Sequence, residues 1–284
     1  MKLGAVVILY HPDGSLKDRL LTYLPYVEKL FIFDNSENTV PRDLLADLPS
    51  PDKVSYYTDN ENRGIAVRLN QAIQMAINEQ FDWLLTMDQD SYFANHNFSN
   101  FLTCLKNYPE NNNVAVFGVQ YLDAALQAAA CHAVTTNHLI TSGSILNLSL
   151  FPLIGNFDEK LFIDQVDSEY CYRAILKSYK IVQFENIYLQ HNLGQQSIHR
   201  SLKSFKKTKR SLHSPLRLYY MTRNYFYMRA KFQKHFPAEI GELKEDLLVR
   251  IKNNFLYSSQ KLSLIRNILL GIVDYKRGNM GKKS

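Results

Sequence analysis

Two aspartates at the end of the first ninety residues have the spacing of a divalent-metal site. Asp88 and Asp90 flank Gln89 directly after the apolar stretch WLLTM. Carboxylates two residues apart can reach one cation and its neighbouring ligand, and hard oxygen ligands favour Mg²⁺ or Mn²⁺. A D-x-D pair alone is a weak signal, because aspartate is common in turns that close strands. The pair therefore predicts a Mg²⁺ or Mn²⁺ site only together with its surroundings.

A second segment, NRGIAVRLNQAI from Asn62 to Ile73, could hold an anion. Gly64 stands between an expected strand and an expected helix, where a residue without a side chain lets the backbone approach a ligand closely. The amino end of a helix favours negative charge. Because Gly64 stands alone, the segment is neither a G-x-G-x-x-G fingerprint nor a Walker loop. An ordinary strand–helix turn remains the alternative to nucleotide binding.

The segment from Phe157 to Arg173 holds a candidate general base. It contains five carboxylates among aromatic residues, namely Asp158, Glu159, Asp164, Asp167 and Glu169. Asp167 comes just before or at the start of an expected helix, where backbone N–H groups keep a carboxylate ionised. An ionised carboxylate in a cleft can accept a proton from a substrate hydroxyl. The alternative is that Asp167 or Ser168 only caps the helix.

Two later groups of polar residues extend the candidate site. His191 ends another expected strand, where it would either complete a metal site or serve as a hydrogen-bonded structural residue. Farther on, Arg217, Tyr220 and Asn224 are about one helical turn apart. Arg217 and Arg223 could clamp a diphosphate. The alternative is an exposed helix surface with long basic side chains.

Alternating strands and helices position the first of these residues. Strands are expected at 3–10, 27–33, 54–57 and 82–87, and helices at 16–24 and 65–77. This alternation predicts an α/β fold with a doubly wound, mostly parallel sheet. Ligands of such sheets lie beyond the carboxyl ends of the strands, which is where Asp34, Asn62 and Asp88 fall.

The pattern loosens after residue 93. Strands are expected at 114–121 and 181–184, and a helix at 168–177. Within 138–148, a small-residue turn at 141–144 is expected beside apolar strand residues. The polar, basic stretch 195–213 is expected to be a mobile loop. The chain from Pro215 onward has helical spacing, with an apolar stripe that runs from Leu262 to Val273.

Composition excludes several classes of protein. The 284 residues are 46% hydrophobic and 21% charged, which fits one large α/β domain or two joined subdomains and not a disordered chain. Cys104, Cys131 and Cys171 form no C-x-x-C pair, so neither a zinc ribbon nor a disulfide scaffold is expected. No apolar run is long enough to span a bilayer. The run from Leu3 to Tyr10 is interpreted as a buried strand and not a signal peptide, which predicts a cytosolic protein.

Charge is distributed unevenly along the chain. Residues 1–198 carry a net charge of −9 and residues 199–284 a net charge of +15. A basic region on an acidic body suggests a polyanion or an anionic membrane surface as partner. Nucleic acid is disfavoured, because the aromatic and basic residues there follow helical spacing and match no zinc-finger or RRM pattern. The alternative is a solvated helical surface.

Seven motifs in order resemble those of one family, the bacterial family 2 glycosyltransferases of GT-A fold. They are Tyr10, DNS at Asp34, N-x-G-I-A-x-x-x-N from Asn62, DQDS at Asp88, F-D-E-x-L-F-I-D-x-V-D-x-E-x-C-x-R from Phe157, H-N-L-G at His191 and R-x-Y-Y-x-x-R-N at Arg217. The chain is most similar to the branch of L-rhamnosyltransferases that use dTDP-rhamnose. The resemblance covers roughly residues 3 to 230 and leaves the last fifty residues without a family signal.

The resemblance assigns roles to the donor-binding residues. Asp34 matches the acid that contacts the pyrimidine nucleoside. Asp88 matches the first acid of D-x-D, near the ribose and the metal, and Asp90 the acid that binds the metal. Tyr10, Asn62 and Gly64 belong to the expected nucleotide site, as do Arg217, Tyr220 and Arg223, which match a segment near the diphosphate or the acceptor. His191 matches a position that is a metal ligand in only some members.

The resemblance also implies the reaction. Asp167 matches the base, although Val166 stands where the family has glutamate, and Asp164 is the nearest rival. Such an enzyme transfers a sugar from a nucleotide donor to a lipid-linked glycan acceptor with inversion. The alternatives are a UDP-galactofuranose or other UDP-hexose donor, or a nucleotide- or glycan-binding module without catalysis.

The implied parts of the chain are three. They are a nucleotide-sugar half at 1–120, an acceptor-binding and catalytic half at 121–198, and a basic loop with C-terminal helices at 199–284. The third part is expected to associate peripherally with the inner face of a bacterial plasma membrane, or alternatively to pack on the domain or a second subunit.

Overall fold

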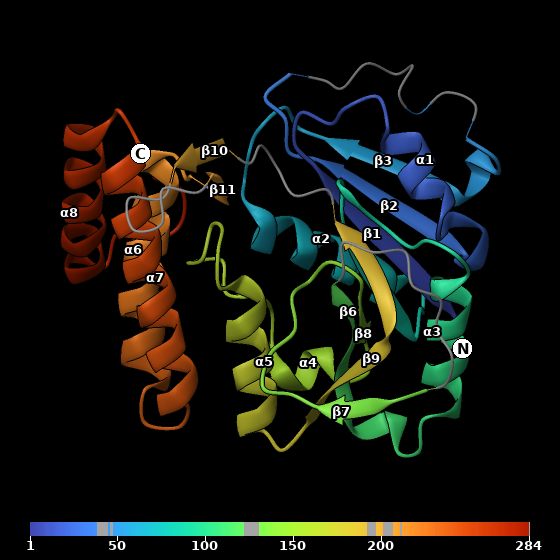
Figure 1. The fold of residues 1–284 in the computed structure, drawn as a ribbon. Coiled ribbons are helices and arrows are strands. Elements are labelled where there is room, and N and C mark those ends of the chain that lie inside the picture. Colours follow the sequence, from blue (N-terminus) through green and yellow to red (C-terminus); the bar gives the residue numbers. More distant parts are fainter. Residues whose placement is uncertain are drawn as a thin grey trace. The chain divides into compact units, whose positions relative to one another are not determined.

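The structure, a computed structural model, describes residues 1–38, 45, 48–121, 131–191, 197–200, 207–210 and 212–283 (Figure 1). For residues 191, 197–200 and 207–210 the description is limited to the backbone. The chain divides into two compact units: unit 1 comprises residues 1–159 and 166–192, and unit 2 comprises residues 160–165 and 193–284. The predicted parts 1–120 and 121–198 therefore fall almost entirely within unit 1, and the part 199–284 falls within unit 2.

Unit 1 is built on a nine-stranded sheet whose first half is parallel, in the order β3-β2-β1-β4. The strands are β1 Leu3–Leu9, β2 Lys29–Asp34, β3 Val54–Thr58 and β4 Trp83–Asp88. The inner strands β1, β2 and β4 are apolar and buried along most of their length, as parallel strands covered on both faces must be. The register pairs Asp34 of β2 with Leu9 and Asp88 of β4 with Ile8. The two acids therefore lie on either side of the carboxyl end of β1.

The second half of the sheet is mixed. It contains β8 Ser144–Asn147, β6 Val114–Tyr121, β9 Lys180–His191 and β5 Ser91–Tyr92, with β7 Ala133–Thr135 paired to β9. Strand β8 runs antiparallel to β4 and β6, whereas β6 and β9 are parallel. The turn expected at 141–144 is present at residues 141–143, and β8 begins directly after it. The predicted α/β fold with a mostly parallel central sheet is confirmed.

Helices cover the sheet of unit 1. They are α1 Leu16–Leu21, α2 Ile65–Asn78, α3 Asn97–Asn107, α4 Phe151–Ile154 and α5 Val166–Leu176, with short 3-10 helices at Leu24–Tyr26, Pro51–Lys53 and Asn111–Asn113. Leu16 of α1 and Phe98 and Phe101 of α3 join alternate residues of β1 in one buried cluster. Helix α2 contacts β1 and β2. The long buried core explains why the strand ends are fixed in place.

A disulfide joins two cysteines of unit 1. Cys104 in α3 is bonded to Cys131, two residues before β7, with the two Cα atoms 5.4 Å apart. The sequence pattern predicted no disulfide scaffold and gave no sign of this single bond, because 27 residues separate the two cysteines and no short spacing signals them. Cys171 is free and buried, and burial raises the pKa of its thiol to about 12.

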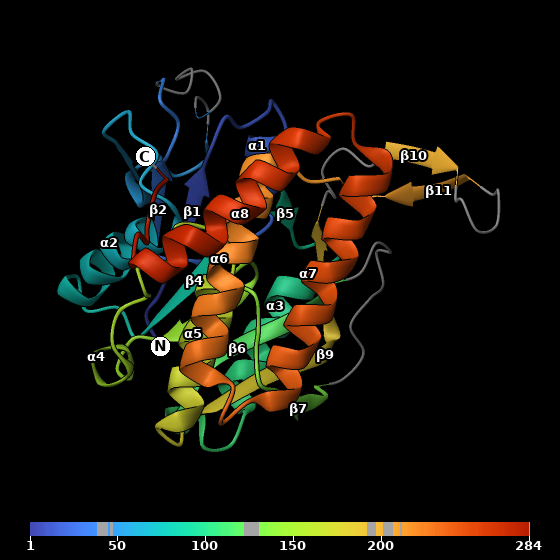
Figure 2. The same ribbon diagram turned by 90° about the vertical axis from the view of Figure 1, so that its left-hand side faces the viewer.

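Unit 2 consists of three long helices, α6 Pro215–Phe232, α7 Pro237–Tyr257 and α8 Lys261–Arg277. Helix α6 begins at a proline, and the side chain of Ser214 accepts a hydrogen bond from the Arg217 backbone N–H. Helix α8 crosses α6 closely (Figure 2). A Cβ atom at Gly271 would lie 2.7 Å from the Tyr219 carbonyl oxygen, so this crossing requires glycine.

Two stretches of the basic segment 195–213 differ from the expected mobile loop. Strands β10 Ser197–Arg200 and β11 Lys207–Arg210 pair antiparallel. Residues 195–196, 201–206 and 211 lie outside the described residues, as do residues 124–130 of the Ala-rich stretch. Among the helices of the described residues, none has both the length and the apolar character needed to cross a membrane.

Candidate active site

The donor-side residues of unit 1 meet at the carboxyl ends of β1, β2 and β4. Tyr10 follows β1 directly, Asp34 ends β2 and Asp88 ends β4. Because these strands are parallel neighbours, their ends lie at one edge of the sheet. Tyr10 is half-exposed there, and its hydroxyl lies 3.4 Å from a Glu37 carboxylate oxygen. The structure therefore brings together three residues that the sequence pattern placed in one site.

Asp34 is completely buried. Its Oδ1 accepts the Ser36 backbone N–H at 2.9 Å and its Oδ2 accepts the Tyr56 hydroxyl at 2.6 Å. Tyr56 lies in the middle of β3, where it pairs with Ile32, so this bond links β3 to the end of the adjacent strand β2. The Tyr56 hydroxyl and the Ser36 N–H thus fix the carboxylate that the family resemblance assigns to the nucleoside.

Asn35 links this edge to the Asn62–Gly64 turn. Its Oδ1 accepts the Arg63 backbone N–H at 3.0 Å and the Arg68 Nε at 2.9 Å, and its Nδ2 donates to the Gly64 carbonyl. Gly64 has a φ of +83° and is the residue before α2, so the turn uses the conformational freedom that glycine provides. Asn62 Oδ1 accepts the Gly64 N–H at 3.1 Å. Asn62 therefore stabilises the turn at Gly64, in the segment that the sequence pattern suggested as an anion site.

Arg68 is a buried cation of this network that the sequence pattern did not single out. It lies on α2 with 3% of its surface exposed. Its guanidinium is paired with Asp59, and its Nη2 donates to the Glu61 carbonyl at 2.8 Å. All these partners precede α2, so Arg68 holds the strand–helix connection in one shape.

Gln89 fixes the D-x-D turn from its middle position. Its Oε1 accepts the Tyr10 N–H at 2.7 Å and its Nε2 donates to the Tyr10 carbonyl at 2.9 Å. Arg19 of α1 donates to the Gln89 carbonyl at 3.0 Å and is paired with Asp13. The turn that carries Asp88 and Asp90 is therefore tied to the end of β1.

The D-x-D residues suit a divalent cation only if a bound ligand supplies further oxygen atoms to it. Among the described residues, no group of three or more His, Cys, Asp or Glu side chains is placed to hold a metal. Mg²⁺ is commonly bound by one or two carboxylates together with substrate phosphates, so Asp88 and Asp90 suit a metal that a nucleoside diphosphate completes. For His191 only the backbone is described: it ends β9 and pairs with Ser91, the residue after Asp90.

The turn at residues 141–144 contacts the end of β4. Asp88 donates its backbone N–H to Ser142 Oγ at 3.1 Å, and Gly143 donates its N–H to the Thr86 carbonyl at 2.8 Å. The hydroxyl of Tyr121, at the end of β6, donates to the Ser142 carbonyl. Burial and then the charges of Asp88 and Asp167 raise the pKa of Tyr121 well above its usual value. Asp88 and Asp167 therefore both lie within electrostatic reach of one phenol.

Asp167 lies in the first turn of α5, which begins at Val166. Its Oδ1 accepts the Ser168 N–H at 2.9 Å. Asp167 lines a small pocket together with Thr141, Ser144 and Cys171. Because the helix starts at Val166, Asp167 lies within the first turn and does not only cap it, and negative charge is favourable at that end of a helix.

Other motif residues of unit 1 have structural partners. The fully buried Glu169 is paired with Arg173 at 2.7 Å, and Arg173 also donates to the carbonyls of Ile154 and Asn156. Asn70 of α2 exchanges two hydrogen bonds with the backbone of Phe157. These contacts place the start of the F-D-E motif against α2 and fix the helix that carries Asp167.

The motif residues of unit 2 are mostly part of its interior. Arg223 is completely buried, its guanidinium lies over the rings of Tyr219 and Tyr220, and its Nη1 donates to the Asn279 carbonyl at 3.4 Å. Tyr220 is buried, and its hydroxyl accepts the Lys283 N–H at 2.9 Å. The predicted diphosphate clamp is therefore corrected at Arg223, because this guanidinium is enclosed by its own unit.

Arg217 keeps part of its surface exposed and is paired with Asp164 at 2.6 Å. Asp164 and Gln165 have φ values of +67° and +66°, a backbone conformation that is uncommon outside glycine. Asn224 holds this segment by donating to the carbonyls of Ile163 and Asp164. Asp164, the rival base, is therefore engaged by an arginine of unit 2, whereas Asp167 belongs to unit 1.

Comparisons with known proteins concern the family and the fold of the chain. A family model described as glycosyl transferase family 2 matches residues 15–130. The dTDP-rhamnosyl transferase RfbF of Shigella flexneri is 26% identical, over 98% of this chain and 96% of that protein.

Solved structures with the same fold are more distant in sequence. A mannosyltransferase from Pyrobaculum calidifontis, in complex with GDP-Man and Mn²⁺, has a TM-score of 0.60 at 11% identity over 97% of this chain and 87% of its own. GalNAc-T7 with UDP, GalNAc and Mn²⁺ has a TM-score of 0.57 at 10% identity over 92% of this chain and 58% of its own. TarS of S. aureus has a TM-score of 0.59 at 13% identity over 98% of this chain and 49% of its own.

Proposed function

Because this chain carries a family 2 glycosyltransferase domain on a GT-A fold, we propose that it transfers L-rhamnose from dTDP-rhamnose to a lipid-linked surface glycan. The acceptor would belong to an O-antigen, a capsule or a cell-wall polysaccharide. One observation carries the proposal: the 141–144 turn accepts the Asp88 backbone N–H at Ser142 Oγ, and Thr141 and Ser144 of the same turn line a small pocket with Asp167, so the D-x-D turn and the candidate base border one segment of unit 1. The similarity to RfbF over nearly the full length of both chains supports rhamnose as the sugar.

The donor would occupy the carboxyl edge of the parallel strands. Tyr10, Asp34 and the Asn62–Gly64 turn would surround the nucleoside, and Asp88 and Asp90 would face the diphosphate through Mg²⁺ or Mn²⁺. The bound cation would stabilise the negative charge that develops on the departing nucleoside diphosphate. Arg217, which is partly exposed, is the residue of the unit 2 motif that remains in this proposal as a ligand for the phosphates or the acceptor.

Asp167 would act as the general base. Its carboxylate would accept the proton of an acceptor hydroxyl while that oxygen attacks the anomeric carbon of the sugar. The new C–O bond forms on the face opposite the diphosphate, the bond to the diphosphate breaks, and the configuration inverts. Asp167 suits this role because the amino end of α5 favours its ionised form without adding a second charge.

The acceptor lipid would bring the protein to the inner face of a bacterial plasma membrane, and α8 of unit 2 offers a surface for it. Successive helix residues rotate by about 100°, so Leu262, Leu269 and Val273 lie within about 20° of one line, while Leu264 and Gly271 point the opposite way. Leu264 and Gly271 are buried, whereas Leu262 is 84% and Leu269 56% exposed.

Basic residues flank this apolar stripe of α8. They are Lys261, Arg266, Lys276 and Arg277, and all four are exposed. An apolar line with lysines and arginines beside it suits the headgroup region of an anionic bilayer, to which each cation near the surface adds about 1 kcal/mol of attraction. We therefore propose a cytoplasmic protein that associates peripherally with the membrane.

A donor panel tests the proposed reaction. Release of nucleotide would be measured from dTDP-rhamnose, UDP-galactofuranose and UDP-hexoses, each with Mn²⁺, with Mg²⁺ and with EDTA. We expect turnover of dTDP-rhamnose with a divalent cation and loss of turnover in EDTA. Preferred turnover of a UDP-sugar would replace rhamnose in the proposal, and equal turnover in EDTA would remove the metal from it.

A further inference from the structure

We infer that the Thr141–Ser144 turn, through Ser142 and Tyr121, is a positioning element that fixes the metal-side acid Asp88 relative to the base-bearing helix α5. This inference rests on the proposed function, because it assigns a role to Ser142 and Tyr121 only if Asp88 and Asp167 act as proposed. The turn is short, almost completely buried at Ser142, and contacts both sides of the site.

On the donor side, the turn is bound to the end of β4. Ser142 Oγ accepts the Asp88 backbone N–H at 3.1 Å, one residue from the D-x-D centre. The Thr86 carbonyl accepts the Gly143 N–H at 2.8 Å, and Thr86 donates its hydroxyl back to the Ser144 carbonyl at 3.1 Å. These hydrogen bonds attach the turn to the strand that carries Asp88.

On the base side, the chain just before the turn contacts α5, and the turn itself borders the pocket that Asp167 lines. Cys171 lies with its sulfur 3.9 Å from the Leu139 carbonyl oxygen, and Asp167 shares a small pocket with Thr141 and Ser144. Gly143 has a φ of +69°, and a Cβ atom there would lie 2.8 Å from a Leu189 side-chain carbon. The turn is thus enclosed by β9 as well, which leaves it little room to shift.

Tyr121 closes the arrangement at the end of β6. Its hydroxyl donates to the Ser142 carbonyl, so one serine receives a bond from Asp88 and another from Tyr121. Groups that orient a metal-binding residue without contacting the metal typically lower metal affinity by about 10- to 100-fold when they are removed.

Two neighbouring serines allow a matched test in the full-length protein. Ser142 and Ser144 are both buried, but the Ser144 hydroxyl donates to the Ile140 carbonyl at 2.6 Å, whereas the Ser142 hydroxyl accepts the Asp88 N–H. We expect Ser142→Ala to weaken Mn²⁺-dependent dTDP binding, measured by calorimetry, about tenfold. We expect Ser144→Ala to leave it within about twofold of wild type. Equal effects of the two variants would overturn the inference.

A second variant keeps the test valid if Ser142→Ala folds poorly. Tyr121→Phe removes only the hydroxyl that donates to the Ser142 carbonyl, and we expect kcat/KM for the donor to fall about tenfold, because the support of Asp88 through Ser142 is weakened. Tyr108→Phe, at the opposite end of the sheet, is its control. Wild-type kinetics in Tyr121→Phe would contradict the inference.

Failure of the proposed function gives a different pattern. If Asp90→Ala keeps Mn²⁺-dependent dTDP binding, the metal proposal itself is wrong. If Asp90→Ala loses that binding while Ser142→Ala and Tyr121→Phe match their controls, the metal proposal stands and the inference about the turn is wrong.

Discussion

Two buried arginines, one in each unit, show how differently similar residues serve this protein. Arg68 of unit 1 holds Asn35, Asp59 and the Glu61 carbonyl, all in segments that form the donor edge. Arg223 of unit 2 lies over Tyr219 and Tyr220 and holds the C-terminal segment. Both lie in motifs that suggested anion binding, but only Arg223 was itself expected to bind the phosphates. Position at a strand end is therefore a better guide to the site than residue type.

The largest effect should separate Asp167 from Asp164. Asp167→Asn removes the proton acceptor and keeps the shape of the side chain, so we expect transfer to fall about 10²- to 10⁴-fold with donor binding unchanged. Asp164→Asn should lower thermal stability more than turnover, because it weakens the pair with Arg217. Turnover in steady-state assays and melting temperature distinguish the two. The reverse pattern would move the base to unit 2.

The arginine comparison gives the second prediction. Arg68→Met should weaken dTDP binding by about tenfold or more, because a buried hydrogen-bonded charge is worth about 1.5–3 kcal/mol and here it shapes the donor edge. Arg223→Met should lower the free energy of unfolding by a similar amount and leave dTDP binding unchanged. Denaturant unfolding and calorimetry measure both. Loss of dTDP binding in a well-folded Arg223→Met variant would return Arg223 to the donor site.

A third prediction concerns the exposed apolar residues of unit 2. Leu269→Glu on α8 should reduce sedimentation with vesicles of phosphatidylglycerol and phosphatidylcholine about tenfold, since one buried leucine contributes about 1.5–3 kcal/mol. Leu248→Glu on α7 is the matched control, because Leu248 is also about half exposed. Binding of the wild type should weaken at high salt. If Leu269→Glu instead changes the molar mass in light scattering, the stripe is an interface between copies of the chain.

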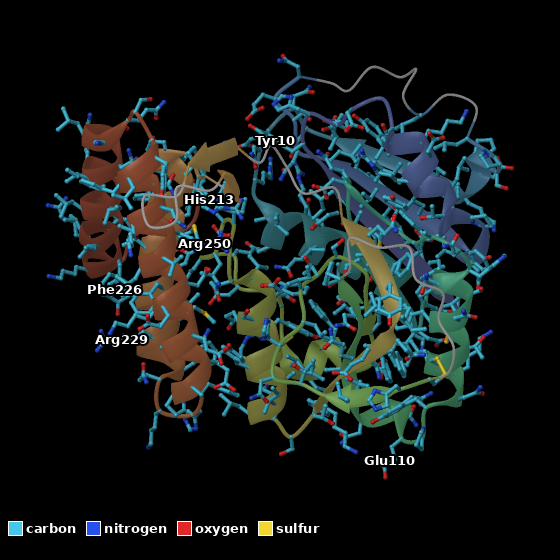
Figure 3. All side chains as sticks on the ribbon, viewed as in Figure 1. Tyr10, Glu110, His213, Phe226, Arg229 and Arg250 are labelled. Atoms are coloured by element: carbon cyan, nitrogen blue, oxygen red, sulfur yellow. A yellow bond between two sulfur atoms is a disulfide. The ribbon has the colours of Figure 1, made fainter. Side chains whose placement is uncertain are left out.

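The smallest predicted effect is a pH dependence within unit 2. Burial, then Arg250 and Arg217, lower the pKa of His213, while Asp164 and Asp246 act in the opposite direction. Figure 3 shows His213 close to Arg250, with the two side chains in contact. Because the unfolded chain takes up a proton near pH 6.5 more readily than the folded chain, His213 should reduce stability as the pH falls from 7 to 5. His213→Gln should flatten that decline in melting temperature. An unchanged slope would show that another group dominates.

Much of unit 1 could be predicted from the sequence because its signals are local. Apolar runs of strand length ending in polar residues placed Asp34 and Asp88 at one edge, and the family resemblance added Tyr10. The structure brings the ends of these strands together. The residues that support this edge were missed, among them Asn35, Arg68, Gln89, Tyr121 and Ser142. Gln89 bonds to a residue 79 positions away and Ser142 to one 54 positions away. No periodicity within a short window reports such a contact.

Unit 2 was harder to predict because helical spacing does not show which face is covered. The spacing of Arg217, Tyr220 and Arg223 fits both an exposed clamp and a buried support, and burial decided for Tyr220 and Arg223. The stripe of α8 likewise fits both packing and exposure, and the requirement for glycine at position 271 shows which face meets α6.

The path of the chain between the units limits how this protein can be divided or recombined. Residues 160–165 belong to unit 2 although the sequence on both sides belongs to unit 1. Their partners, among them Arg217, Tyr220 and Asn224, come more than fifty positions later. A fragment that ends at residue 192 would leave these six residues without those contacts. An exchange of C-terminal helices between relatives would therefore have to carry the segment 160–165 with it, so that two separate stretches of the gene must vary together.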